Sequence, residues 1–266
     1  MSPGAVGVVE HAGGGIAYAV TGEPATSPVL FAHSLGLDRS SWDSQVASLS
    51  SAFRTVQIDL RGHGASGAPP GPYGLEDLAS DVLAVADALA VQQFHFVGLS
   101  ISGMVAQYLG IHHRDRLRSL TICNTAPRIG TPEFWQERID AIRDGGMAAI
   151  SEAVTARFFS EGFGDMAPDV YDAARSTLEA TDPDGYIGCC QAVAAADLRR
   201  EIGGITTPSL VIGGREDLAT PPEQAELIHQ AVAGSRLVIL DGAGHVSNLE
   251  QPGAFTAALA DFLRFS

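Results

Sequence analysis

The hydrophobic positions of this chain form short apolar runs that alternate with longer amphipathic stretches. Runs rich in β-branched and aromatic residues predict strands at residues 29–33, 55–60, 94–97, 117–124, 208–214 and 236–241. Helical spacing of apolar residues occurs at 75–90, 104–109 and 252–264. Strands that alternate with helices in this way indicate an α/β fold with a mainly parallel sheet and helices on both faces. The first 22 residues differ, because their alternation and the glycines at 13–15 predict a hairpin.

The alternation stops between residues 129 and 200. No strand is predicted there, and Gly and Pro separate four helical stretches at 132–144, 147–158, 168–179 and 185–196. We therefore expect an α/β core made of residues 1–128 and 201–266, with residues 129–200 inserted as a helical cap. Ordinary helical packing is the alternative interpretation. The insertion separates the candidate nucleophile from the candidate acid described next, which favours a lid that shapes a pocket.

The pentapeptide G-L-S-I-S at residues 98–102 lies between a predicted strand and a predicted helix. A serine on such a sharp turn forms a nucleophile elbow, and the strained backbone requires small residues two positions before and after it. Gly98 meets this requirement fully, and Ser102 meets it approximately, because glycine is usual there. The alternative is a Ser/Gly-rich turn without chemistry, so assigning Ser100 as nucleophile depends on partners elsewhere in the chain.

The partners follow in the order expected for this architecture, first an acid and then a histidine. Asp217 lies just after the predicted strand 208–214, and His245 lies just after the strand 236–241. The carboxyl ends of parallel strands are where sites are built. We therefore expect Ser100, Asp217 and His245 to form a catalytic triad. Glu216 is the alternative acid, but the spacing of Asp217 from Gly214 matches the usual loop.

An oxyanion hole in this architecture uses the N–H of the residue after the nucleophile and an N–H from the loop after the third strand. The first donor is therefore Ile101, and we choose Leu35 as the second because it follows the predicted strand 29–33. His33 lies in the same loop. We interpret it as a residue that shapes the loop through hydrogen bonds to the backbone, rather than as a second catalytic base.

Charge and composition exclude several classes of protein. The net charge is −15, and all 16 basic residues are arginine, so neither a lysine Schiff base nor a P-loop lysine is available. No basic stripe exists to bind nucleic acid or an anionic membrane surface, and no apolar run approaches the ~18 residues of a membrane span. The three cysteines include an adjacent pair, which argues against a disulfide framework and fits a reducing cytoplasm. The start of the chain lacks the features of a signal peptide, and we predict no metal site.

Over essentially its whole length the sequence resembles the α/β-hydrolase superfamily, which also carries the loop D-x-R-G-H-G-x-S found at residues 59–66. Four further motifs resemble the 3-oxoadipate enol-lactonases: C-N-T-A at 123–126, R-I-G-T-P-E at 128–133, G-Y-x-G-C-C at 185–190 and H-x-S-N-x-E at 245–250. The resemblance implies the same triad, the same two oxyanion donors and no cofactor. Ser102 departs from the family pattern, and His33 begins a loop whose first residue differs in some relatives.

The resemblance also implies a reaction, the opening of a small carboxylated lactone through an acyl-enzyme on Ser100. In a chain of net charge −15 a local cation must recognise the carboxylate. Trp135 and Arg138 are three residues apart on the first cap helix and so share a face, and Arg128 lies just before it. Alternatively, these arginines pair with acidic neighbours at the surface.

Other functions compatible with the triad stay open at this point. They are an esterase or lactonase for another substrate, a cofactor-free haloperoxidase, an acyltransferase, and a ligand receptor with a nearly idle triad. The sequence does not determine whether the chain forms a homo-oligomer.

Overall fold

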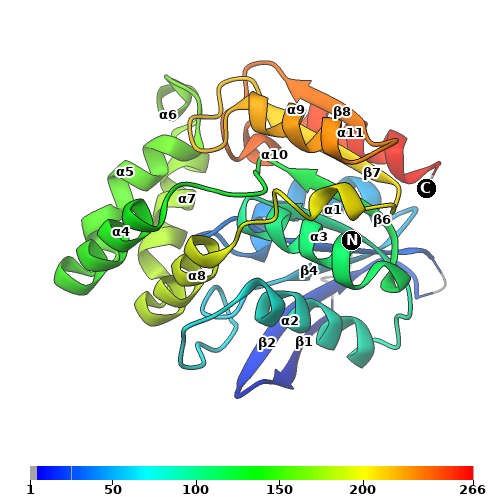
Figure 1. The fold of residues 1–266 in the computed structure, drawn as a ribbon, viewed down its shortest axis with the longest axis horizontal. Helices are drawn as coiled ribbons and strands as arrows, with labels where there is room; N and C mark the ends of the chain where they lie inside the picture. Colours follow the sequence, from blue (N-terminus) through cyan, green and yellow to red (C-terminus); the bar gives the residue numbers. More distant parts are fainter. Residues whose placement is uncertain (1–4, 25, 266) are drawn as a thin grey trace.

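The computed structural model describes residues 5–24 and 26–265; the start of the chain used above to argue against a signal peptide, residues 1–4, lies outside the described residues. Eight strands form one sheet in the order β1-β2-β4-β3-β5-β6-β7-β8 (Figure 1). Their bounds are β1 Ala5–His11, β2 Gly14–Thr21, β3 Pro28–Ala32, β4 Arg54–Ile58, β5 Phe94–Leu99, β6 Leu117–Cys123, β7 Ser209–Gly214 and β8 Arg236–Leu240. Within the described residues, β2 pairs antiparallel with both of its neighbours, β1 and β4, and the other neighbouring strands pair in parallel. The predicted mainly parallel sheet is confirmed.

The central strands are buried on both faces. Every residue of β5 and of β7 is buried, from Phe94 to Leu99 and from Ser209 to Gly214. A parallel strand covered by helices on both sides needs a continuous apolar run rather than an alternating one. The six strands predicted from such runs agree with the structure to within two residues at each end.

Helices cover both faces of the sheet, as predicted. α2 (Leu75–Ala88) and α3 (Ile101–His112) pack against each other, and with α9 (Pro222–Ala231) they lie in front of the strands in Figure 1. α1 (Asp43–Leu49) and α11 (Pro252–Leu263) pack together behind the sheet. The sheet is therefore the middle layer of three, and its core is closed to solvent from both sides.

The segment between β6 and β7 contains the helices that interrupt the α/β alternation. They are α4 (Pro132–Gly145), α5 (Ala148–Phe158), α6 (Phe163–Met166), α7 (Pro168–Ala180) and α8 (Pro183–Ala195), and they stand at one end of the sheet in Figure 1. Four of them match predicted helices, and the four-residue α6 was not predicted. The chain enters this segment near Pro127 and leaves it near Leu198. The two connections lie side by side, because Leu198 N–H donates to the Pro127 carbonyl at 2.8 Å. The domain limits at 128/129 and 200/201 stay a prediction.

The N-terminal hairpin turns one residue earlier than predicted. Ala12 and Gly13 have φ angles of +47° and +82°, and Gly14 and Gly15 already belong to β2. Positive φ at both central residues is the geometry that matches the twist of a two-residue hairpin.

Among the described residues, no helix is both long enough and apolar enough to cross a membrane.

Candidate active site

The predicted elbow is a strained turn between β5 and α3. Ser100 has φ +61° and ψ −116°, a region that non-glycine residues rarely adopt. A Cβ atom on Gly98 would lie 2.0 Å from the backbone oxygen of Ser102, so only glycine fits there. Ser100 N–H donates to the Cys123 carbonyl at 2.9 Å, and the Thr125 hydroxyl donates to the Ser100 carbonyl at 2.7 Å. These bonds to the end of β6 hold the strained serine in place.

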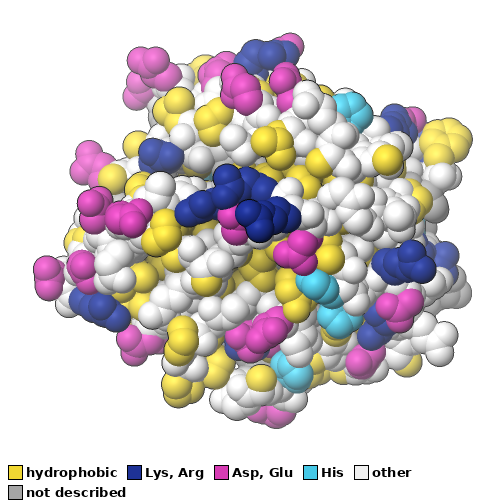
Figure 2. Space-filling model, in the orientation of Figure 1, with side chains coloured by type: hydrophobic (Ala, Val, Ile, Leu, Met, Phe, Trp, Pro, Cys, Tyr) yellow, Lys and Arg dark blue, Asp and Glu magenta, His cyan; other side chains and the backbone are white. Residues whose placement is uncertain are grey.

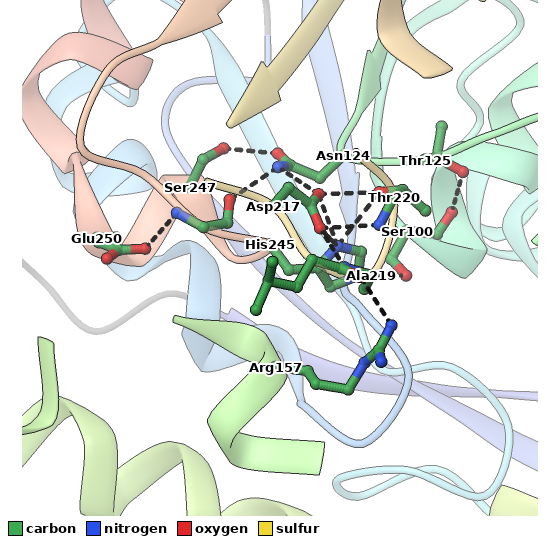
Figure 3. Close-up of polar contacts among 12 residues, drawn as sticks. Ser100, Asn124, Thr125, Arg157, Asp217, Ala219, Thr220, His245, Ser247 and Glu250 are labelled. Atoms are coloured by element: carbon green, nitrogen blue, oxygen red, sulfur yellow. Dashed lines mark hydrogen bonds and ion pairs between the residues drawn. The ribbon is translucent and has the colours of Figure 1, made fainter. Parts of the chain in front are cut away.

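The structure brings the three predicted triad residues together (Figure 3). Ser100 Oγ lies 2.9 Å from His245 Nε2, and His245 Nδ1 lies 2.9 Å from Asp217 Oδ2. A carboxylate can only accept, so Nδ1 carries the proton and Nε2 accepts from the serine hydroxyl. All three side chains are buried. This arrangement can remove the proton of Ser100 when its oxygen attacks a carbonyl carbon.

The carboxylate of Asp217 is held by its own loop as well as by His245. Oδ1 accepts from the N–H groups of Ala219 and Thr220, each at 2.8 Å, and Oδ2 accepts from the Thr220 hydroxyl at 2.9 Å. Burial opposes ionisation, but His245 and these donors outweigh it and lower the pKa of Asp217 below its ordinary value. The alternative acid, Glu216, is exposed. The structure therefore places Asp217, and not Glu216, against the histidine.

Asn124, at the end of β6, is a residue of the site that sequence reasoning did not assign. Its amide nitrogen donates to Asp217 Oδ2 at 3.1 Å and to the Gly244 carbonyl at 3.0 Å, while its oxygen accepts from the Ser247 hydroxyl at 2.6 Å (Figure 3). One buried side chain thus joins the acid loop to the histidine loop. Its only sequence signal was its place in the C-N-T-A motif.

Glu250 joins the histidine loop to the helical segment. Its carboxylate accepts from Gly244 N–H at 2.6 Å and from Ser160 N–H at 3.0 Å. Val246 N–H also donates to the Phe158 carbonyl at 2.9 Å. The end of α5 and the loop of the candidate base therefore hold each other in place.

One predicted oxyanion donor follows the nucleophile directly in the chain, and the residue that carries the other lines the same cavity as Ser100. Ile101 begins α3, where the first N–H groups have no acceptor within the helix, and Leu35 lines the cavity beside Ser100. In residues 5–24 and 26–265, neither N–H donates to another protein group. Buried backbone N–H groups are rarely left unpaired. The pair is suited to hold a negatively charged oxygen.

The loop that carries Leu35 is fixed by two buried histidines. His33 Nδ1 donates to the Ser34 carbonyl at 2.8 Å, and its Nε2 accepts from Leu60 N–H at 3.0 Å. His63 Nδ1 faces the Arg61 carbonyl at 3.1 Å, and its Nε2 accepts from Gly36 N–H at 3.0 Å. The predicted loop-shaping role of His33 is confirmed. Both rings must be neutral, because each Nε2 accepts a hydrogen bond.

This neutrality makes stability depend on pH. Burial lowers the pKa of His33, that of His63 to about 3, and that of His95 to about 4. The unfolded chain binds these protons below pH ~6.5, whereas the folded protein does not until a much lower pH. The free energy of unfolding is therefore expected to fall as the pH falls from about 6.5 to about 4, by up to about 1.4 kcal/mol per pH unit for each histidine.

Urea unfolding at pH 7.5, 6.0 and 5.0 measures this dependence. The variant His95→Gln removes one of the three groups and is expected to make the pH dependence less steep. An unfolding free energy that stays constant from pH 7.5 to 5.0 would contradict the prediction.

A cavity of about 270 Å³ opens at Ser100 between the core and the helical segment. Its lining consists of Ser34, Leu35, Ser100, Ile129, Gly130, Phe134, Trp135, Arg138, Val154, Arg157, Phe158, Tyr186, Ala219 and His245. It includes two arginines and no acidic residue. The Arg138 guanidinium lies 4.9 Å from the ring centres of both Phe134 and Trp135, and among the described residues it has no acidic partner. A cation is thus held in the cavity by aromatic rings.

Trp135 and Arg157 both line the cavity, and each already donates a hydrogen bond to a backbone carbonyl. The Trp135 indole N–H donates to the Ile129 carbonyl at 2.7 Å, so its ring face is what the cavity receives. Arg157, which sequence reasoning did not select, donates to the Leu218 carbonyl at 2.8 Å and reaches the loop of Asp217 from α5 (Figure 3).

The structure does not bring Arg128 to the cavity. Its guanidinium lies 3.7 Å from the carboxylate of Asp197, at the connections between core and helical segment. This position gives no support to the expectation that Arg128 binds a substrate carboxylate, which stays a prediction.

Comparison with known proteins supports this description of the fold. The model of the α/β hydrolase fold matches residues 27–252. The 3-oxoadipate enol-lactonase 2 of Acinetobacter baylyi is 35% identical over 242 residues, which cover 91% of this chain and 90% of that protein. The crystal structure of an enol-lactonase from Burkholderia xenovorans has a TM-score of 0.94 at 42% identity and covers 98% of this chain and 100% of its own. A thermophilic esterase from Thermogutta terrifontis has a TM-score of 0.92 at 29% identity, with 98% of each chain covered. The chain therefore belongs to the α/β-hydrolase family and is similar to 3-oxoadipate enol-lactonases.

Proposed function

We propose that this protein is a serine hydrolase that opens a small carboxylated lactone, 3-oxoadipate enol-lactone, to give 3-oxoadipate. The observation that carries the proposal is the position of Arg138, a cation without an acidic partner in the cavity of Ser100. Acidic side chains are spread over the face shown in Figure 2, in line with the net charge of −15. A cavity with two arginines and no carboxylate in such a protein favours an anionic substrate. Enol-lactonases are among its relatives, and the similar Thermogutta terrifontis esterase was solved with malate, a dicarboxylate, bound.

In the first half of the reaction, Ser100 Oγ attacks the lactone carbonyl carbon and His245 Nε2 takes the hydroxyl proton. The carbonyl oxygen becomes an oxyanion that accepts from the N–H groups of Leu35 and Ile101. The ring C–O bond then breaks. The leaving oxygen is an enolate of the same molecule, so the ring opens and nothing departs. The His245 imidazolium returns the proton taken from Ser100 to this oxygen, which leaves the histidine neutral for the second half, and the resulting enol tautomerises to the ketone.

In the second half, water attacks the acyl-enzyme and His245 takes its proton. Collapse of the second oxyanion breaks the bond to Ser100, whose oxygen regains a proton from His245. One water is consumed for each lactone and 3-oxoadipate is released. Asp217 stabilises the charged imidazolium in both halves and keeps the ring in the correct tautomer.

The direct test is the loss of enol-lactone absorbance with purified protein. Multiple turnovers are expected, with no added cofactor. Cleavage of a neutral aryl ester without cleavage of the lactone would keep the hydrolase and reject the lactone. Absence of both activities would reject the hydrolase proposal.

Arg138 is expected to bind the substrate carboxylate. A hydrogen bond to a charged group contributes about 1.5–3 kcal/mol, so Arg138→Ala should raise KM for the lactone about 10- to 100-fold. The same variant should change KM for 4-nitrophenyl acetate, which has no carboxylate, by less than about threefold. Arg128→Ala is the matched control, because this arginine pairs with Asp197 outside the cavity.

Steady-state kinetics of both variants on both substrates decide the point. An equal change in KM for the charged and the neutral substrate in Arg138→Ala would show that Arg138 supports the cavity but does not bind the carboxylate. The cavity's other arginine, Arg157, would then be the next candidate.

A further inference from the structure

Ser102 occupies the position of the elbow where glycine is usual, and its hydroxyl makes a specific bond. The side chain is fully buried, and Oγ donates to the backbone carbonyl of His33 at 2.7 Å. The backbone of residue 102 is also fixed, because its carbonyl packs directly against Gly98 of β5. The hydroxyl therefore connects a rigid part of the elbow to the end of β3.

The His33 carbonyl is the first group of the loop that carries Leu35. The next carbonyl, that of Ser34, accepts from the side chain of His33 at 2.8 Å. Ser34 C=O and Leu35 N–H belong to one planar trans peptide and point in opposite directions. Fixing the carbonyl therefore fixes the direction of the N–H. Two successive carbonyls of the loop are thus held, one by Ser102 and one by the His33 ring.

Ser102 is also covalently adjacent to Ile101, the other expected oxyanion donor. Its side chain anchors the loop of Leu35, while the peptide that carries Ile101 N–H is held by the Thr125 hydroxyl, which donates to the Ser100 carbonyl. The Ser102 hydroxyl is thus a direct link between the helix start that carries one donor and the loop that carries the other. A glycine at 102 has no hydroxyl with which to make the connection.

We propose that Ser102 is a positioning residue of the oxyanion hole, which holds the N–H groups of Leu35 and Ile101 at the spacing that a tetrahedral intermediate requires. The inference rests on the proposed serine-hydrolase reaction, but not on the identity of the lactone. Donors that act on the oxyanion contribute more in the transition state than in the substrate complex. Loss of the Ser102 hydroxyl therefore lowers kcat and leaves KM nearly unchanged.

The experiment compares Ser102→Ala, Ser102→Gly and Ser102→Thr with the wild type. Ser209→Ala is the matched control, since Ser209 is also buried and donates to a backbone carbonyl, that of Thr207 at 2.8 Å, at the start of β7. For each protein, kcat and KM are measured with 4-nitrophenyl acetate. The inhibition constant of a trifluoromethyl ketone, whose adduct with Ser100 carries an oxyanion, and the thermal midpoint are measured as well.

Complete loss of one oxyanion donor costs 10²- to 10³-fold in kcat, so a displaced donor is expected to cost roughly tenfold. In Ser102→Ala and Ser102→Gly, kcat and the affinity for the ketone should fall by the same factor, with KM within about twofold of the wild type. Ser102→Thr, which keeps the hydroxyl, should recover most of the loss. Ser209→Ala and Ser102→Ala each remove one buried hydrogen bond, so both should lower the thermal midpoint by a similar amount. Ser209→Ala should do so without changing kcat.

Unchanged kcat in Ser102→Ala, or a lower kcat with unchanged affinity for the ketone, would overturn the proposal. A failure of Ser102→Thr to fold leaves the alanine and glycine variants to decide it. A wild-type protein that neither cleaves the ester nor binds the ketone would overturn the proposed function, and the role of Ser102 with it. A wild type that cleaves the aryl ester but not the enol-lactone would leave the role of Ser102 intact.

Discussion

Replacing Ser100 with alanine is expected to lower kcat by about 10⁶-fold for every ester or lactone that the protein cleaves. The variant lacks the only oxygen that lies within 2.9 Å of His245 Nε2 in the described part of the chain. Water would then have to attack the carbonyl directly, with the oxyanion donors of Leu35 and Ile101 still in place. Those donors alone sustain a small residual rate over the uncatalysed reaction.

The fold should survive this change. Alanine keeps the Cβ atom, so it meets the same strain at φ +61° that serine does. The bonds from the N–H and to the carbonyl of residue 100 use only its backbone atoms and are therefore kept. Circular dichroism and the thermal midpoint check the fold, and a fluorophosphonate probe should label the wild type but not the variant. Activity within tenfold of the wild type would exclude the acyl-enzyme mechanism.

The sheet and the order of the three candidate triad residues could be read from the sequence because both depend on local patterns. A buried parallel strand is an apolar run, and an elbow needs a small residue such as Gly98 before its serine. Short helices such as α6 (Phe163–Met166) have too few residues for a helical period to be visible. Their formation depends on the neighbours they pack against, which the sequence does not display.

The hydrogen bonds that hold the candidate triad in place could not be predicted from the sequence, for a different reason. The bond from Asn124 to Asp217 spans 93 positions, and the bond from Glu250 to Ser160 spans 90. No periodicity relates residues so far apart. The pairing of Arg128 with Asp197 was missed for the same reason, because the position of Arg128 next to α4 in the sequence does not show which side chains surround it.

The second large effect is expected from Asp217→Asn, which should lower kcat roughly 10⁴-fold. The Oδ1 position accepts two backbone N–H groups, from Ala219 and Thr220, so the asparagine oxygen will occupy it. Its NH₂ group then takes the Oδ2 position and donates toward His245 Nδ1. The imidazole must then adopt the tautomer with its proton on Nε2, and this nitrogen can no longer accept the proton of Ser100.

Asn124 increases the cost of this variant. Its amide nitrogen donates to Oδ2 in the wild type at 3.1 Å, and in Asp217→Asn two NH₂ groups would face each other in a buried site. Such a pair leaves donors without acceptors, so a loss of stability of about 1–3 kcal/mol is expected as well. The double variant Asn124→Asp/Asp217→Asn puts an acceptor opposite the new amide, but the same oxygen then faces the Gly244 carbonyl, to which Asn124 donates in the wild type. It should therefore recover only part of the lost stability and none of kcat, because the NH₂ group still faces the histidine.

Glu216→Gln is the matched control for these measurements. It neutralises the neighbouring carboxylate, which is exposed and makes no contact with His245 among the described residues, so kcat should stay within about twofold of the wild type. Steady-state kinetics and urea unfolding of the three variants separate tautomer control from simple stability. If Asp217→Asn kept its activity while Glu216→Gln lost it, the acid of the triad would be Glu216 and not Asp217. The loop after β7 would then have to rearrange before catalysis.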